Sequence, residues 1–446
     1  MKLIIIHPGV QHAPRLANGA LRTGLFEKVT LLTSVLFKPE QKVMDFLKKR
    51  VKPIDEEVRI VNHYLYTFLF TVSRYLYNKV FINPHNQRHN NPIYFWQQIF
   101  GVLCLPRLYF QRKNILVVCF ETTGWPVVKY CKKWRVPVVM DFASISHEKA
   151  KTLGINETEY GINLKVKERA LIDYGFYCSD FCRKSFEGLT SAKKDFVLYL
   201  GAEGRGSQEP RIKNKEAYVV ENDGENQEES SKKQDAYFME SHEENQEESS
   251  KYQEEKNDTS EKVKVSFIAN LEYRKGLDIF LESIYAYEYP VFLEVHLIGR
   301  IREEWVNEHM PKQVINQDVK LIYRPAMSQS ELFAYLQQEA FDLNVQCSRF
   351  DSFAMVVPET MMQGIPNVVS PFVGAGEMIK NGIDGFIMEQ LDSLSLYRIL
   401  VKYLSLNGQE RKELKAQVLK SSKEMVWENY YANLGGAFKA ILNDIR

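Results

Sequence analysis

The 446-residue sequence has no uncharged apolar run of the roughly 18–20 residues that a membrane-spanning helix needs. Met1 and Lys2 precede only four apolar residues, which predicts a β-strand rather than a signal peptide. The six cysteines are scattered, with no C-x-x-C pair and no accompanying histidine pattern, which argues against a disulfide framework or a zinc site. These absences predict a cytoplasmic protein with reduced, mostly buried thiols.

Acidic residues are missing from residues 58–120, which hold seven Arg and Lys, three His and many aromatic side chains. Basic residues interleaved with Tyr, Trp and Phe are typical of surfaces that dock on anionic lipid, here the inner face of a membrane. The alternative is that the aromatics form core beneath a basic, solvated edge. The same composition suits single-stranded nucleic acid, but no recognition motif accompanies it, so we expect no nucleic-acid partner.

The net charge of +1 conceals two halves of opposite sign. Residues 1–205 carry 31 Lys and Arg against 17 Asp and Glu, a net of +14. Residues 263–446 carry 19 against 23, a net of −4. The first half is therefore expected to meet something anionic.

The composition breaks at residues 222–262, which hold 14 acidic residues and five lysines, with an eight-residue repeat beginning at Glu225 and again at Glu244. Such a segment buries too little apolar surface to offset its ordering entropy, so we expect disorder. It is interpreted as a solvated insertion or, alternatively, a regulatory tether. The expected division of the chain is a first domain 1–205, an acidic insertion or linker 206–262, a second domain 263–425 and a final segment 426–446.

Both halves alternate short apolar strands with helical patterns. The expected strands include residues 3–6, 29–33, 115–119 and 136–140 in the first half, and 263–268, 293–298, 319–323, 343–345 and 367–369 in the second. This alternation predicts an α/β fold with two parallel, doubly wound sheets. Ligands of such sheets bind beyond the carboxyl ends of the strands, so a crevice between the domains is the expected site.

One stretch, from Cys347 to Phe386, concentrates the chemistry. Asp351 follows a strand, and Glu359 lies eight positions later in the first turn of a helix, where the helix dipole favours a carboxylate. After a Gly-Ile-Pro turn, Gly374-Ala375-Gly376 opens a further helix whose amides suit an anion such as a diphosphate. Acceptors for sugar or ribose hydroxyls beside such amides suit a nucleotide sugar.

This stretch resembles the donor-binding segment of retaining GT-B glycosyltransferases, the large family four. That family carries two acidic residues eight positions apart, then a Gly-Ile-Pro turn and a glycine loop. The resemblance implies that Glu359 holds ribose hydroxyls, that Asp351 stands near the transferred sugar where the family has Glu, and that the amides of Gly374–Gly376 face the donor.

The segment from Ser266 to Gly276 resembles the strand and loop that open the family's donor domain. There a Lys and an earlier Arg grip the diphosphate. Lys275 matches the Lys, whereas Asn270 stands at the position of the Arg and brings no charge. Arg274 is a candidate to compensate for it.

The first half resembles the family less closely. The loop from His7 to His12 is similar to the glycine-containing loop that approaches donor phosphate and acceptor, which makes Gly9 and His12 candidates. His147 follows a strand where family members place a histidine at the sugar. Either histidine is alternatively a surface or capping residue. Trp427-Glu428 and Tyr430-Tyr431 resemble the final helix that in this family crosses back to the first domain.

The resemblance implies transfer of a hexose-type sugar, with retention of configuration, from a nucleotide sugar to a glycan or lipid-linked acceptor in surface polysaccharide or glycoconjugate synthesis. Lysine and amides can offset the charge of the leaving diphosphate, so no metal or other cofactor is expected. The alternatives are a nucleotide-sugar epimerase on the same fold and a non-catalytic partner subunit with a degenerate donor site, for which Asn270 and Asp351 are the support.

Overall fold

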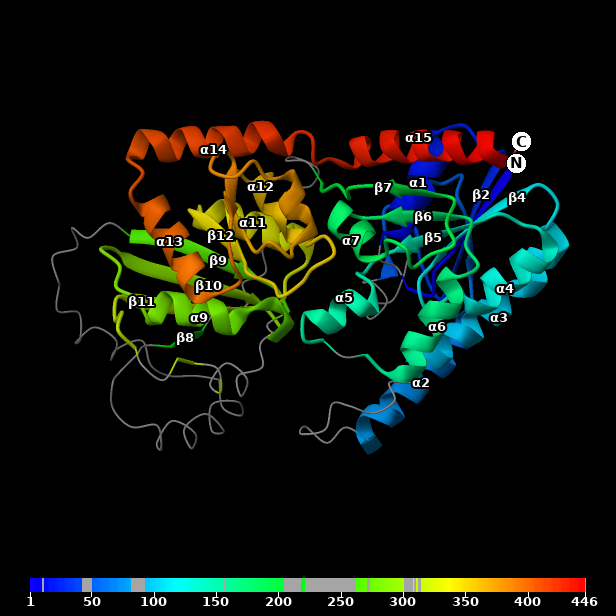
Figure 1. Cartoon of the computed structure of the whole chain (residues 1–446), viewed down its shortest axis with the longest axis horizontal. Helices are drawn as coiled ribbons and strands as arrows, with labels where there is room; N and C mark the ends of the chain where they lie inside the picture. The colour runs from blue at the N-terminus through cyan, green and yellow to red at the C-terminus, as the bar shows by residue number, and fades with distance from the viewer. Residues whose placement is uncertain are drawn as a thin grey trace.

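The structure is a computed structural model of the whole chain. It describes residues 1–9, 12–41, 50–81, 93–155, 157–203, 218–220, 262–270, 273–300, 308, 310–311 and 314–445. Two lobes, each built on a seven-stranded sheet, lie side by side (Figure 1).

The first sheet is parallel throughout, with the strand order β3-β2-β1-β4-β5-β6-β7. Its strands are β1 (Lys2–Ile6), β2 (Lys28–Thr33), β3 (Arg59–Asn62), β4 (Ile115–Phe120), β5 (Val138–Phe142), β6 (Tyr174–Tyr177) and β7 (Lys194–Val197). The helices between them are α1 (Ala13–Arg22), α2 (Tyr64–Phe81), α3 (Ile93–Gln111), α4 (Trp125–Trp134), α5 (His147–Thr152), α6 (Glu159–Arg169) and α7 (Asp180–Ser185). The interior strand β1 is buried on both faces, which explains its unbroken apolar run.

The second sheet has the order β14-β13-β12-β9-β10-β11-β8 and is parallel except for β8. Its strands are β8 (Tyr218–Val220), β9 (Lys262–Ile268), β10 (Phe292–Gly299), β11 (Val319–Pro325), β12 (Leu343–Gln346), β13 (Asn367–Val369) and β14 (Gly385–Ile387). The helical elements of this half are η2 (Tyr273–Lys275), α9 (Leu277–Tyr285), α11 (Gln329–Glu339), α12 (Val356–Met361), η3 (Gly374–Met378), α13 (Ser393–Leu404), α14 (Gly408–Ser422) and α15 (Trp427–Ile445). Two parallel, doubly wound sheets confirm the fold class expected from the strand and helix alternation.

Strand β8 lies within the segment 206–262, which was expected to be an acidic insertion or linker without a strand of its own. Its three residues pair antiparallel with β11 at the edge of the second sheet. The sequence Tyr-Val-Val is aromatic and β-branched and precedes the acidic repeats, so it has the side chains that favour a strand and finds open backbone partners at the edge. The acidic repeats lie in residues 221–261, outside the described residues.

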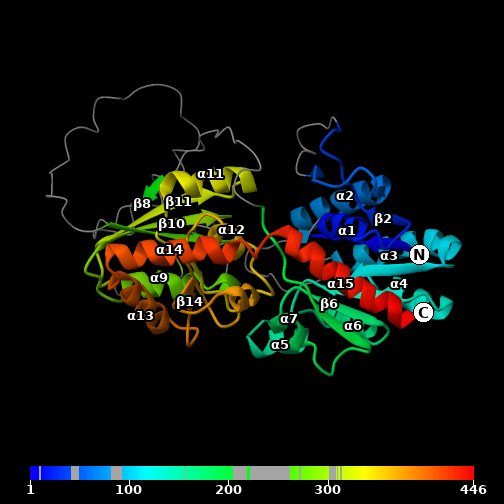
Figure 2. The same cartoon turned by 90° about the horizontal axis from the view of Figure 1, so that it is seen from above.

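Helix α15 lies on the first lobe, although α14, which precedes it, covers the second lobe (Figures 1 and 2). It packs against α1 so closely that a Cβ added at Gly19 would lie 2.6 Å from Tyr431 Cδ1. The Phe438 ring is fully buried, edge-on to Phe26 at a centroid distance of 4.9 Å and to Phe176 at 5.6 Å. The last helix is therefore part of the first domain's core.

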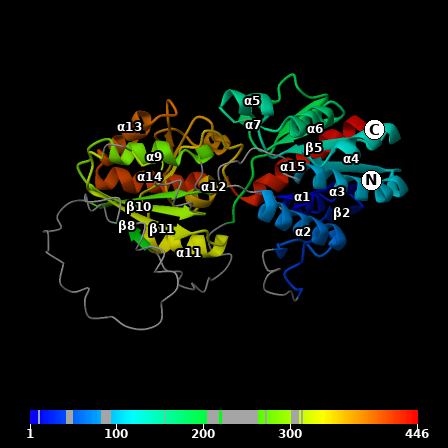
Figure 3. The same ribbon diagram turned by 90° about the horizontal axis from the view of Figure 1, so that it is seen from below.

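The α2 helix lies at the border of the first lobe (Figures 1 and 3), and α3 packs against α4. Among the described helices, none combines the length and apolar character that crossing a bilayer requires. Tyr66 and Phe100 are buried here, so some aromatics of residues 58–120 do belong to the core. Others, including Leu65 and Phe68 of α2, are exposed.

We expect Phe438→Ala to lower the free energy of unfolding by about 3–5 kcal/mol, because the change empties a buried ring site between α15 and the first sheet. Urea denaturation measures the loss. Lys439→Ala, the next residue of the same helix and exposed, is the control and should change the stability by less than about 0.5 kcal/mol. Equal effects of the two changes would contradict the packing of α15 on the first domain.

Candidate active site

A cleft of about 970 Å³ lies between the two domains, beyond the carboxyl ends of their strands. The first domain contributes His12, Arg15 and Ala143, and the second contributes Lys275 and Asp351. This volume is at the upper end of the range of about 300–1,000 Å³ typical of small-molecule sites. The crevice expected from the two doubly wound sheets is therefore present.

Lys275 and Asp351 form an ion pair at the wall of the cleft, and each side chain is only about one-seventh exposed (13% and 15%). Asp351 Oδ1 also accepts hydrogen bonds from the amides of Phe353 at 3.2 Å and Ala354 at 2.8 Å. Burial by itself would raise the pKa of Asp351, but Lys275, then Arg274 and the amide of Phe353, outweigh it, so the pKa is lowered. Asp351 is therefore an anion that holds a cation at the cleft.

Arg274 lies beside this pair, with Nη1 4.0 Å from Asp351 Oδ2 and 3.2 Å from the carbonyl oxygen of Phe350. Its guanidinium stacks over the Phe350 ring at 5.3 Å, and its side chain is one-third exposed. Asn270 is exposed just beyond the carboxyl end of β9 and is not among the residues that line the cleft. Arg274 and Lys275 thus supply the positive charge on this side.

Glu359 lies in the first turn of α12, as expected, and reaches the cleft through a neighbour. Its Oε1 accepts a hydrogen bond of 2.7 Å from Gln329 Nε2, and Gln329 lines the cleft. Burial raises the pKa of Glu359 to about 7, opposed by the hydrogen bond from Gln329. Glu359 is therefore on the same side of the cleft as Lys275 but forms no direct pair with it among the described contacts.

The Gly374-Ala375-Gly376 segment lies in the contact between the domains. Its three amides donate to the carbonyl oxygens of Asp351 at 2.9 Å, Phe353 at 2.8 Å and Val373 at 2.9 Å. A Cβ at Gly374 would lie 2.1 Å from the Ser352 carbonyl oxygen, which explains why glycine is needed there. In this arrangement the three amides are engaged by the backbone and do not point at an anion in the cleft.

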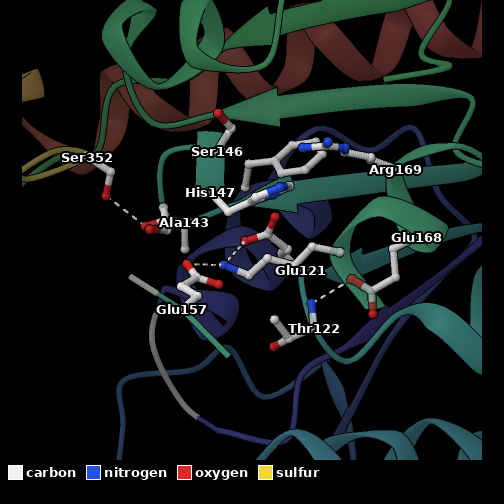
Figure 4. A network of polar contacts seen from close by, with 12 residues as sticks. Glu121, Thr122, Ala143, Ser146, His147, Glu157, Glu168, Arg169 and Ser352 are labelled. Carbon is white, nitrogen blue, oxygen red and sulfur yellow. Dashed lines mark hydrogen bonds and ion pairs between the residues drawn. The ribbon is translucent and has the colours of Figure 1, made fainter. Parts of the chain in front are cut away.

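The loop 351–377 is also tied to the first domain by side chains. Ser352 Oγ donates to the carbonyl oxygen of Ala143 at 2.7 Å (Figure 4), and Ser179 Oγ donates to that of Ser352 at 2.6 Å. The Glu377 carboxylate accepts from the amide of Asp180 at 2.8 Å, at the amino end of α7. These bonds hold the two sheets in their facing arrangement.

His12 lines the cleft from the first domain and is paired with a carboxylate. Its Nε2 lies 2.9 Å from Asp141 Oδ2, and both side chains are nearly buried, at 10% and 5% exposure. Asp141 comes from β5, 129 residues along the chain, and the sequence pattern alone did not single it out. Gly9 does not line the cleft. Its amide instead donates to His7 Nδ1 at 2.8 Å, and its carbonyl accepts from Thr33 at 2.9 Å.

His147 begins α5 behind Ala143 and is not among the side chains that line the cleft. Figure 4 shows it within a polar network of the first domain, where its Nδ1 lies 3.2 Å from Glu148 Oε2 and Glu148 pairs with Arg169. Burial lowers the pKa of His147, which favours the neutral ring. In the same domain, Lys165 Nζ lies 2.8 Å from Glu157 Oε1 in a second ion pair.

The structure therefore brings His12, Lys275 and Asp351 to one cleft, with Arg274 and Glu359 beside it. Neither Arg274 nor Glu359 lines the cleft itself, and the other candidates outside the lining are Gly9, Asn270, His147 and Gly374–Gly376. Sequence reasoning missed Asp141, Gln329 and the ion pair of Arg15 with Glu203, whose members line or flank the cleft. No local pattern marks these residues, since each is recognised only by a partner far along the chain.

Two doubly wound parallel domains with a ligand cleft between the carboxyl ends of their strands define the GT-B class. Residues 248–421 match the family of glycosyl transferases group 1. The fold is therefore of GT-B architecture, and a region in the second half of the chain matches this family.

Among curated proteins, sucrose synthase of Thermosynechococcus vestitus is 25% identical over 142 residues, which are 32% of this chain and 15% of that protein. The aligned region is thus a small part of this relative. Among solved structures, sucrose-phosphate synthase of Thermosynechococcus elongatus is similar with a TM-score of 0.63 and 11% identity, over 100% of both chains. HepE of Anabaena, in complex with UDP and glucose, is similar with a TM-score of 0.58 and 13% identity, over 99% of this chain and 100% of that chain. At these identities the two structures establish the fold.

We expect stability to depend on pH through Glu359. Since the folded pKa of about 7 exceeds the ordinary value of 4.5, the folded protein keeps a proton that the unfolded chain has already lost. The free energy of unfolding therefore falls as pH rises from about 4.5 to about 7 and levels off above that value.

Glu359→Gln removes this slope, so urea denaturation at several pH values should show the variant gaining on the wild type as pH rises from ~5 to ~8. Glu389→Gln, an exposed residue of the same domain, is the control and should follow the wild-type profile. A gain that is the same at both ends of the pH range would contradict the raised pKa.

Proposed function

We propose that this protein transfers a hexose-type sugar, with retention of configuration, from a nucleotide-sugar donor to a glycan or lipid-linked acceptor. The observation that carries the proposal is the cleft between the domains, where the second domain presents the Lys275–Asp351 pair with Glu359 beside it. The complex of the structurally similar HepE with UDP and glucose supports a nucleotide-sugar donor.

On the donor side, Lys275 and Arg274 would stabilise the diphosphate as it leaves, because positive charge placed at developing negative charge lowers the barrier. Asp351 holds Lys275 in place and would contact hydroxyls of the transferred sugar. Glu359 would bind the ribose hydroxyls, with Gln329 orienting its carboxyl group. These groups can offset the leaving charge without a metal ion or other cofactor.

On the acceptor side, the first domain presents His12, oriented by Asp141, together with Arg15 and Lys52. These groups would orient an acceptor hydroxyl so that it attacks from the face of the sugar that the leaving group occupied. We further propose that the acceptor belongs to surface polysaccharide or glycoconjugate synthesis and that the protein works at a membrane surface, which the basic composition of residues 58–120 supports.

Four of the candidates would contact donor or acceptor only after the site rearranges on donor binding. They are Gly9, Asn270, His147 and the loop Gly374–Gly376. In the present arrangement the loop amides are engaged by backbone carbonyl groups. Domain closure is a common response of two-domain enzymes to their ligands and would change the contacts of a loop that lies between the domains.

We expect thermal-shift measurements to show stabilisation by one class among UDP-, GDP- and other activated sugars, since a ligand that binds only the folded protein raises its stability. Glu359→Ala should weaken binding of that donor by roughly 10- to 100-fold, the loss of one or two charge-assisted hydrogen bonds. Glu389→Ala is the control and should bind like the wild type. Unchanged donor affinity of Glu359→Ala would contradict the assignment.

We expect Lys275→Ala to reduce the rate of nucleoside diphosphate release in the presence of acceptor by about 10²–10³-fold, because the leaving group loses a cation. The exposed Lys412→Ala is the control. Since an unpaired Asp351 can destabilise the fold, the double variant Lys275→Gln/Asp351→Asn keeps the pair hydrogen-bonded and neutral and should lose activity as well. An active double variant would refute the role of the pair.

The same assays separate the other interpretations. Isomerised donor without acceptor would indicate an epimerase, whereas donor binding without release would indicate a non-catalytic partner subunit. The configuration of the product, read from the anomeric coupling in its proton spectrum, tests retention.

A further inference from the structure

The α2 helix presents an unpartnered apolar stripe to solvent. Leu65, Phe68, Val72 and Tyr75 are 72%, 64%, 39% and 63% exposed. Their spacing of three or four residues places them on one side of the helix, opposite the buried Tyr66. Figures 1 and 3 show α2 at the outer border of the first lobe, so no described element covers this side.

The neighbouring α3 helix also exposes apolar side chains, namely Phe95, Val102, Leu103 and Phe110, of which Phe110 is 84% exposed. The helix buries little besides Phe100, Cys104 and Leu108. Exposed apolar side chains scattered singly are normal on a protein surface, but a row of them along one side of a helix marks an interaction surface.

Beside this surface, a pocket of about 440 Å³ lies between β3 and the second half of α3. Its walls are apolar at Val61, Leu103 and Phe110, and Arg59 and Arg107 bring two positive charges to it. Neither guanidinium forms an ion pair with a carboxylate of the described residues. An apolar wall that carries two cations matches a ligand with an anionic group and a hydrocarbon chain.

His63 strengthens this match. It also lines the pocket, and its buried Nε2 has no hydrogen-bond partner in the described part of the chain. Burial, followed by the charge of Arg107, lowers the pKa of His63, so its ring is neutral at neutral pH and able to donate one hydrogen bond. An oxygen of an anionic group between Arg59 and Arg107 would satisfy this buried nitrogen.

We propose that the α2–α3 surface docks on a bilayer that contains anionic lipid, with a lipid phosphate seated in the pocket of Arg59, His63 and Arg107. The apolar side chains of α2 and α3 enter the interface between headgroups and acyl chains. The absence of Asp and Glu from residues 58–120 removes repulsion by the lipid. A second copy of the chain on this surface would bring the same positive charges together, which disfavours a dimer.

The first test is flotation with vesicles of neutral phosphatidylcholine, with and without phosphatidylglycerol, at low salt and without any sugar nucleotide. We expect the protein to bind the anionic vesicles and to lose binding as salt is raised. Equal partitioning to both kinds of vesicle, or no binding to either, overturns the proposal.

The variant Leu65→Ser/Phe68→Ser should weaken vesicle binding at least roughly tenfold, because each side chain contributes the transfer of its apolar surface. Ile383→Ser, an exposed residue of the second domain, is the control and should bind like the wild type. Both sites are exposed, so the melting temperature should stay unchanged and a loss of binding would not reflect unfolding. Binding that survives in the double serine variant overturns the role of α2.

The variant Arg59→Ala/Arg107→Ala should reduce binding to anionic vesicles by roughly fivefold per arginine and leave binding to neutral vesicles unchanged. Arg398→Ala in α13, also exposed, is the control. Equal loss on both kinds of vesicle, or none on either, overturns the headgroup site.

Sedimentation equilibrium tests the alternative that a second copy of the chain, rather than a membrane, covers this surface. A dimer that the serine substitutions dissociate would show that a second copy covers α2, and would overturn the membrane proposal. Donor affinity in solution should be unchanged in all these variants, since none of the residues lines the cleft. Absence of vesicle binding would therefore not contradict the proposed sugar transfer, and absence of sugar transfer would not contradict the proposed membrane docking.

Discussion

The Asp351 carboxylate is the contact on which the arrangement of the site depends. One oxygen holds Lys275 at the cleft, and the other accepts the amides of Phe353 and Ala354, which shapes the loop that follows. That loop then carries Ser352 to the carbonyl oxygen of Ala143 in the first domain. A single anion thus couples the Lys275 cation in the cleft to the contact that joins the domains, so its neutralisation would disturb both.

The two domains contribute different kinds of side chain to the cleft. The second domain contributes the Lys275–Asp351 ion pair, whereas the first contributes the His12–Asp141 pair together with Arg15 and Lys52. Helix α15 ties the two halves together, because it follows the second domain in the chain but packs on the first. The proposed membrane surface lies on α2 and α3 of the first domain, where exposed apolar side chains accompany Arg59 and Arg107.

Much of this architecture could be predicted from patterns within short segments. The alternation of apolar strands and helices predicts two parallel sheets, because strand and helix periods are local properties of the chain. The spacing of Asp351 and Glu359 places one on a loop and the other in a first helical turn, and both lie there in the structure. The edge strand β8 was not predicted, since three residues beside an acidic repeat give too short a pattern.

Local patterns were enough to predict the fold class and the crevice between the two domains. Which candidates face that crevice depends on the folded chain: His12 does, paired with Asp141, while His147 lies in a separate polar network and the Gly374–Gly376 amides bond to the backbone. The tertiary structure also decided that the α2 aromatics divide between a buried and an exposed side. The physical reason is that periodicity and spacing encode local conformation, whereas hydrogen-bond partners and burial depend on segments that lie far apart in the chain.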